Sequence, residues 1–143
     1  SFFLLPWLVL CTMLSVCKIQ LVHVQSKSVI KNWMQIVLPF QNQQWDEVER
    51  IVKRWIASSP NDSEAMFYEA TTKEHAGDVG YAKTIYQKIL KQNPNHAASI
   101  ISLASIAKKE ASKSDFDQYK SQLAKLNIDA DELDELMKDS AHQ

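Results

Sequence analysis

The chain has 143 residues, and its 16 Lys and Arg nearly balance its 17 Asp and Glu, which leaves a formal net charge of −1 at pH 7. A net charge this small excludes a strong overall field that would steer the chain toward nucleic acid or anionic lipid. Only 2 Gly and 4 Pro occur, and a β-rich fold would need many turns built from such residues. We therefore expect an all-α fold of helices joined by short connections.

The N-terminal segment is apolar enough to cross a membrane. Residues 2–17 carry no charge, and the apolar character continues past Lys18 to Val24. A helix of about 20 apolar residues spans a bilayer, and the long Lys18 side chain can reach the headgroups from such a helix. We predict a transmembrane helix over residues 1–25 that contacts the lipid bilayer through residues 2–24.

Other interpretations of this segment fit less well. A secretory signal would need a basic start, and a lipoprotein signal would need a small residue where Val16 precedes Cys17. A buried soluble helix would show a polar face. The membrane side stays open, because Lys18, Lys27 and Lys31 favour a cytoplasmic location for the rest of the chain, and a basic N-terminus would reverse this.

A repeat follows the apolar segment. Pro60 and Pro94 are each followed by Asn, in what we expect to be two similar turns. The spacing between them fits a repeat of about 34 residues. Between them, Gly77 falls where a turn between two helices is expected, and Ala82 and Tyr86 follow in an A-x3-F spacing. A small Ala82 would let helices approach closely, Tyr86 would fill the groove between them, and Gly77 would supply a positive φ. This period and pattern resemble the tetratricopeptide repeat family.

The resemblance covers three units, at about residues 28–60, 63–96 and 97–127. The middle unit matches the family pattern best. Its first helix departs from the pattern, because Glu69 stands where a Leu is usual and Lys73 where an aromatic residue is usual. We expect the two outer units to have drifted further from the motif while keeping the period.

Each outer unit keeps part of the pattern. In the third, Ile100-x2-Leu103-Ala104-x2-Ala107 follows the first-helix pattern, and Ser114-x-x-Asp117 resembles the capping box of a second helix. In the first unit, Trp33-x2-Ile36-Val37-x2-Phe40 fits the first-helix pattern. Pro39 lies inside this helix and predicts a kink or an early end.

A short capping helix is expected over residues 129–140. Asp129-x-x-Glu132 is a capping box at its start. An apolar stripe follows at helical spacing, formed by Leu133, Leu136 and Met137. The remaining acidic residues of this segment are expected to be solvated near the helix N-terminus.

The resemblance implies an α-solenoid, in which antiparallel helix pairs stack into a right-handed superhelix. Its concave face, formed by the first helix of each pair, would bind peptides or partner helices. For Trp33 and Phe40, packing between repeats is an equally good interpretation. The residues expected on this partner-binding groove are Trp33, Val37, Phe40, Phe67, Thr71, Glu74, His75, Ile101, Ser105, Lys108 and Lys109.

No residue pattern indicates catalysis, a cofactor or a metal. The four histidines, His23, His75, His96 and His142, are scattered without ligand spacing. We expect His96 to start a helix. No Gly-rich phosphate loop is present, and basic residues are not interleaved with aromatic ones as in nucleic-acid-binding surfaces. We expect a protein that is not an enzyme and binds neither nucleic acid nor a small-molecule substrate.

Three functions compete. The first is a scaffold in a single-pass membrane protein, in a bacterial inner membrane, that assembles or stabilises a complex of membrane-protein subunits. The second is an exported or periplasmic accessory protein or chaperone for protein maturation, of the cytochrome-biogenesis or translocon type, which rests on analogy of layout alone. The third is an enzyme whose site another subunit completes, and no residue constellation supports it.

Overall fold

The computed structural model describes residues 34–141. Within this range the chain forms helices, turns and loops without a strand, so the predicted all-α fold is confirmed there. The predicted transmembrane helix lies outside the described residues. Among the helices of residues 34–141, none combines the length and hydropathy that crossing a bilayer requires.

The chain divides into two compact units, residues 1–38 and residues 39–143. The described part of the first unit is helical, with Ile36 buried, Val37 half-buried, and Met34 and Leu38 exposed. The helical conformation continues through Pro39 and ends at residue 41, shortly after the proline whose position predicts a kink or an early end.

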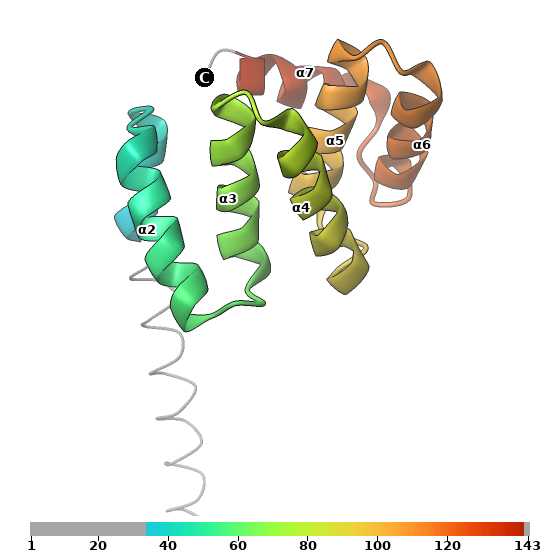
Figure 1. The fold of residues 1–143 in the computed structure, drawn as a ribbon. Helices are drawn as coiled ribbons and strands as arrows, with labels where there is room; N and C mark the ends of the chain where they lie inside the picture. Colours follow the sequence, from blue (N-terminus) through green and yellow to red (C-terminus); the bar gives the residue numbers. More distant parts are fainter. Residues whose placement is uncertain (1–33, 142–143) are drawn as a thin grey trace, which may run out of the picture. The chain divides into compact units, whose positions relative to one another are not determined.

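Six helices make up the rest of the second unit, and Figure 1 shows them in chain order. Consecutive helices pack against each other from α2 to α6, and α7 packs against both α5 and α6. Short connections join the members of each pair. The helices are α2 (Trp45–Ser58), α3 (Ser63–His75), α4 (Val79–Gln92), α5 (Ala97–Lys109), α6 (Lys113–Ala124) and α7 (Ala130–Ala141).

The helices and turns of the chain recur at the same interval that separates Pro60 from Pro94 in the sequence. The helices α2, α4 and α6 begin at positions 45, 79 and 113, and α3 and α5 begin at positions 63 and 97. The residues with positive φ before α2, α4 and α6 are Gln43, Gly77 and Ala111, which follow one another at the same interval. The same helix pair and the same turn therefore recur along the chain.

The recurring turn is a helix C-cap that needs one left-handed residue. At the second turn, the Gly77 N–H donates to the Glu74 carbonyl (3.0 Å) and the Asp78 N–H donates to the Lys73 carbonyl (2.9 Å). These two bonds satisfy carbonyls that the end of α3 would otherwise leave free. Gly77 adopts φ 90° at no steric cost, whereas Ala111 adopts φ 57° with a side chain.

Side-chain caps fix the helix starts. The Asp62 carboxylate accepts from the backbone N–H groups of Glu64 and Ala65 at the start of α3, and the His96 ring accepts from the Ser99 N–H at the start of α5. The Asp129 carboxylate accepts from the Glu132 N–H at 2.9 Å. The expected starts at His96 and Asp129 are thus confirmed.

The capping box expected at Ser114 and Asp117 is wrong. Helix α6 begins at Lys113, with Ser112 at the N-cap. It starts before the predicted capping box because the turn that precedes α4 recurs before α6 at the repeat interval. The Ser112 hydroxyl donates to the Asp115 carboxylate at 2.9 Å and makes no cap bond to the backbone.

The core lies between the paired helices. Ala82 and Tyr86 of α4 are fully buried against Met66 and Ala70 of α3 and Leu103 of α5. The alanines let the helix backbones approach closely, and the Tyr86 ring fills the remaining space. Burial of these side chains is the main source of stability for helices of 13 or 14 residues, which are marginal in isolation.

Helix α7 covers the end of the helix stack. Leu133 and Met137 are buried against Ile100 of α5 and Leu123 of α6. Leu136, the third residue of the apolar stripe predicted for this helix, remains 37% exposed. The stripe therefore packs mainly through Leu133 and Met137.

Candidate partner-binding groove

The predicted groove residues of α3 surround a tyrosine hydroxyl. Phe67, Thr71 and Glu74 are half-buried along one face of α3. Tyr86 reaches this face from α4, and its hydroxyl donates to the Glu74 carboxylate (3.0 Å) and lies 3.2 Å from the Thr71 hydroxyl. Burial, together with the nearby Glu74 carboxylate, raises the pKa of the Tyr86 phenol above its usual value, so this hydroxyl remains a hydrogen-bond donor at neutral pH.

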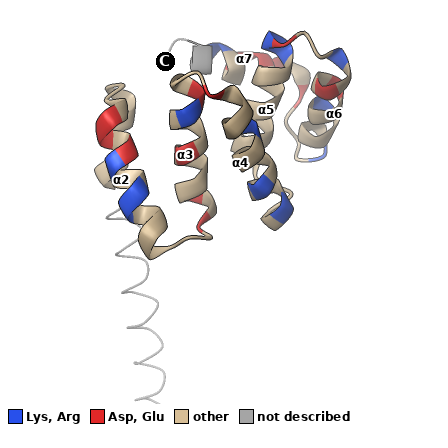
Figure 2. Cartoon of the chain, viewed as in Figure 1, with Lys and Arg blue, Asp and Glu red and all other residues tan. Residues whose placement is uncertain are grey.

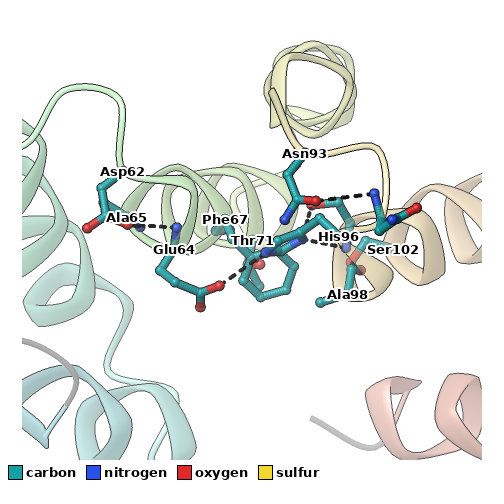
Figure 3. Close-up of polar contacts among 11 residues, drawn as sticks. Asp62, Glu64, Ala65, Phe67, Thr71, Asn93, His96, Ala98 and Ser102 are labelled. Carbon is teal, nitrogen blue, oxygen red and sulfur yellow. Dashed lines mark hydrogen bonds and ion pairs between the residues drawn. The ribbon is translucent and has the colours of Figure 1, made fainter. Parts of the chain in front are cut away.

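A histidine from the next repeat completes this face. The His96 ring lies 5.7 Å from the Phe67 ring between centroids, and its Nε2 lies 3.1 Å from a Glu64 carboxylate oxygen. Because His96 also caps α5 through Nδ1, one side chain joins the start of α5 to the start of α3. Figure 3 shows Glu64, Phe67 and His96 together on this side of the helices.

The C-terminal end of α3 carries a stacked aromatic pair. The His75 ring lies on the Trp45 ring of α2, with centroids 4.0 Å apart and planes at 18°. Partial burial lowers the pKa of His75, and the charge of Lys109 acts in the same direction while Glu74 opposes it. His75 is thus favoured in its neutral form, which suits packing against an aromatic ring.

The predicted residues of α5 lie at or near a hollow that this helix forms with α7. Ser105 is half-buried, and Lys108 and Lys109 are exposed. The Lys108 ammonium lies 3.7 Å from the Asp134 carboxylate of α7. Ile101 packs against the cluster that α7 covers. The hollow has a volume of about 320 Å³, and its walls are Ser105, Lys108, Lys109, Asp134, Met137 and Lys138.

The predicted groove residues before α2 have other roles or lie elsewhere. Phe40 contacts the rings of Trp45 and Tyr68 edge-on, with centroids 5.4 Å apart in both cases. Tyr68 belongs to the following helix pair, so Phe40 packs between repeats. Val37 is half-buried in the first unit, and Trp33 lies outside the described residues.

The two departures from the family pattern face away from this groove. Glu69 accepts from the Tyr81 hydroxyl at 3.2 Å, and Lys73 forms an ion pair with Glu49 of α2 at 3.5 Å. Both help to line a separate hollow of about 280 Å³ between α2, α3 and α4. Polar residues are therefore tolerated at these two positions because each finds a partner.

The prediction from sequence missed three residues that organise the face formed by the predicted residues of α3, namely Glu64, Tyr86 as a polar group, and His96 as a bridge. The sequence does place Tyr86 in the core, but it gives no sign that its hydroxyl reaches α3. Glu64 and His96 are separated by 32 residues, close to the repeat length, and this spacing is the signal that could have joined them.

No group of His, Cys, Asp and Glu within the described part of the chain is arranged to hold a metal ion. Comparison with known families finds no matching family model, and comparison with curated proteins finds no significant match. The function is therefore inferred from the residues of this chain.

Proposed function

We propose that the chain is a membrane-anchored scaffold that binds other proteins through a groove on α3 and α5. The observation that supports this most is the recurrence of one helix pair and one turn at a constant interval along the chain. This interval is the one found in tetratricopeptide repeats, and the proposal assigns the units at 28–60, 63–96 and 97–127 to that family, with a cap at 129–140. Stacked pairs of this kind present a continuous face to a partner.

The chemistry of the groove favours a helix or extended peptide with mixed side chains. Phe67 and Ile101 offer half-buried apolar surface, Glu64 and Glu74 offer carboxylates on α3, and Lys109 offers an exposed ammonium on α5. A partner that places an apolar residue between a basic and an acidic one would match this order. Hydrogen bonds within the groove hold the α3 and α5 faces in a fixed relation, which reduces the ordering needed on binding.

The membrane part of the proposal rests on the sequence of residues 2–24. Their uncharged first part and total length suit a single bilayer crossing. An anchor of this kind would hold the groove close to a bilayer and raise its effective concentration near membrane-bound partners.

Affinity purification of the full chain from native membranes in mild detergent tests the proposal. The partners retained by the wild type are compared with those retained by Ser105→Arg, which places a large cation in the hollow between α5 and α7. The matched control is Ser121→Arg, at an exposed position of α6. Both variants add the same side chain in place of a serine.

We expect the wild type and Ser121→Arg to retain the same partners in fixed ratio, and Ser105→Arg to lose them. A clean monomer from all three chains under several mild detergents would contradict the scaffold function. Equal retention by both variants would keep a scaffold but place the partner on another surface.

A further inference from the structure

The helix that ends at residue 41 exposes two large apolar side chains. Met34 is 65% exposed and Leu38 is 63% exposed, the two highest values for large apolar side chains in the described part of the chain. Residues four apart lie on the same face of a helix, so these two side chains form one patch. Ile36, which is fully buried, lies on the opposite side of this helix. We call Met34 and Leu38 the apolar face.

The helix that carries the apolar face has no charged residue in its described part. Between Lys31 and Asp46 the sequence contains no Lys, Arg, Asp or Glu, although such residues make up 23% of the chain. The other exposed residues of this helix, at positions 35 and 41, are glutamines. Each of the helices α2 to α7 carries charged residues at exposed positions, and Figure 2 shows where they lie. The exposed surface of residues 34–41 is therefore unlike that of the other described helices.

Such a surface suits the boundary between lipid headgroups and acyl chains. Met and Leu side chains are stabilised in proportion to the apolar area that is removed from water. A helix that lies at this boundary places its apolar side chains among the acyl chains and its polar side chains among the headgroups. The glutamines beside the apolar face are uncharged, so they can enter the headgroup layer without the cost of desolvating an ion.

The place of the apolar face in the sequence favours a bilayer as its partner. The proposed anchor ends at Val24, and residues 25–33 can span at most about 35 Å even when fully extended. This connection contains Lys27, Lys31 and Trp33, and Lys and Trp are residue types that suit the membrane–water interface. The anchor would therefore hold the apolar face close to the headgroups.

We propose that Met34 and Leu38 insert into the headgroup–acyl boundary of the bilayer that holds the anchor. The inference rests on the proposed function, because the anchor supplies the proximity that two apolar side chains alone would not. With the apolar face in the lipid, Ile36 on the opposite side of the helix would point away from the bilayer. The contact depends on apolar area, so neutral lipid should be sufficient for it.

The test measures the surroundings of single spin labels in the full chain, reconstituted into phosphatidylcholine vesicles. Cys11→Ala/Cys17→Ala removes the native thiols, and a nitroxide is attached after Met34→Cys, Leu38→Cys or Ser121→Cys. Oxygen concentrates in the lipid and a nickel chelate stays in the water, so their collision rates with the label report where it lies. We expect oxygen to dominate at positions 34 and 38, and the nickel chelate to dominate at position 121, which is exposed on α6.

A matched pair of variants, with the label kept at position 34, tests the apolar contact itself. Leu38→Gln removes half of the apolar face, and Leu136→Gln makes the same change at an exposed leucine of α7. We expect Leu38→Gln to weaken the inserted state about tenfold, as the loss of one buried leucine would, and to move the collision rates toward those in water. Leu136→Gln should leave them unchanged. Salt at about 1 M should have no effect in either variant, because it screens charges only.

Dominance of the nickel chelate at positions 34 and 38 would overturn the proposal, and so would equal effects of Leu38→Gln and Leu136→Gln. Labels that neither reagent reaches would overturn it in favour of a protein contact, which spin–spin broadening would identify as a second copy of the chain. The anchor is judged separately by flotation. A chain that does not float with the vesicles contradicts the proposed anchoring, whereas a chain that floats with its apolar face in water overturns the insertion alone.

Discussion

Replacing Leu133 by Ala should detach α7 from the helix stack. Leu133 is 1% exposed and packs with Ile100, Leu123 and Met137. Truncating a buried Leu to Ala costs about 2–5 kcal/mol. Leu133 and Met137 are the buried side chains of α7 within residues 130–138, and burying two such side chains stabilises the docked helix by roughly 3–6 kcal/mol. The loss is therefore comparable with the whole docking energy of α7.

Hydrogen–deuterium exchange of the full chain measures this directly. In Leu133→Ala we expect the amides of residues 130–141 to exchange much faster than in the wild type, while those of α3 and α4 keep their protection. The control is Leu136→Ala on the same helix, where 37% exposure predicts a cost below about 1 kcal/mol. Equal effects of the two variants, or unchanged exchange of α7 in Leu133→Ala, would refute the packing described for this helix.

Three further predictions follow from single residues. Ala111→Gly should raise the free energy of unfolding by about 1 kcal/mol, and Gly77→Ala should lower it by a similar amount. Both positions have positive φ, where a side chain is strained and glycine is not. Urea denaturation compares the two variants, and shifts of the same sign would contradict the turn geometry. Asp62→Ala should cost about 1–2 kcal/mol in the same assay, since it removes both the α3 cap and the acceptor for the Trp55 indole N–H; an unchanged midpoint would contradict both bonds. The raised pKa of Tyr86 means that its contribution to stability is complete below its ordinary pKa of 10.0 and is lost as the pH rises further. In the wild type the midpoint of urea unfolding should therefore fall as the pH rises above that value, and Tyr86→Phe should make this fall less steep. The same dependence of the midpoint on pH in both chains would argue against a buried phenol.

The repeat was predictable because it rests on local chemistry. Proline disfavours the continuation of a helix, Gly77 can adopt a left-handed conformation, and the interval between Pro60 and Pro94 gives the period. The same turn at Gln43 and Ala111 could not be read from residue type, because both side chains are unfavourable there. At both positions the backbone makes the same C-cap hydrogen bonds as at Gly77, from the Gln43 N–H to the Phe40 carbonyl and from the Ala111 N–H to the Lys108 carbonyl.

The face of α3 on which the predicted groove residues lie was predictable, but the contacts that they make were not. Helical spacing places Phe67, Thr71 and Glu74 on one face of α3. The contacts that organise this face come from Tyr86 and His96 on other elements, and they depend on how closely the helices pack. Sequence periodicity gives the direction in which a side chain points but not the partner it meets.

The scaffold function is tested most directly by photo-crosslinking in native membranes from a single site in the groove. A photoreactive residue at Ser105 faces the hollow between α5 and α7, and one at Ser121 on α6 serves as the control. We predict a discrete adduct between the chain and a second protein from position 105 and none from position 121. No adduct from position 105, or the same adducts from both positions, would contradict a partner bound in the groove.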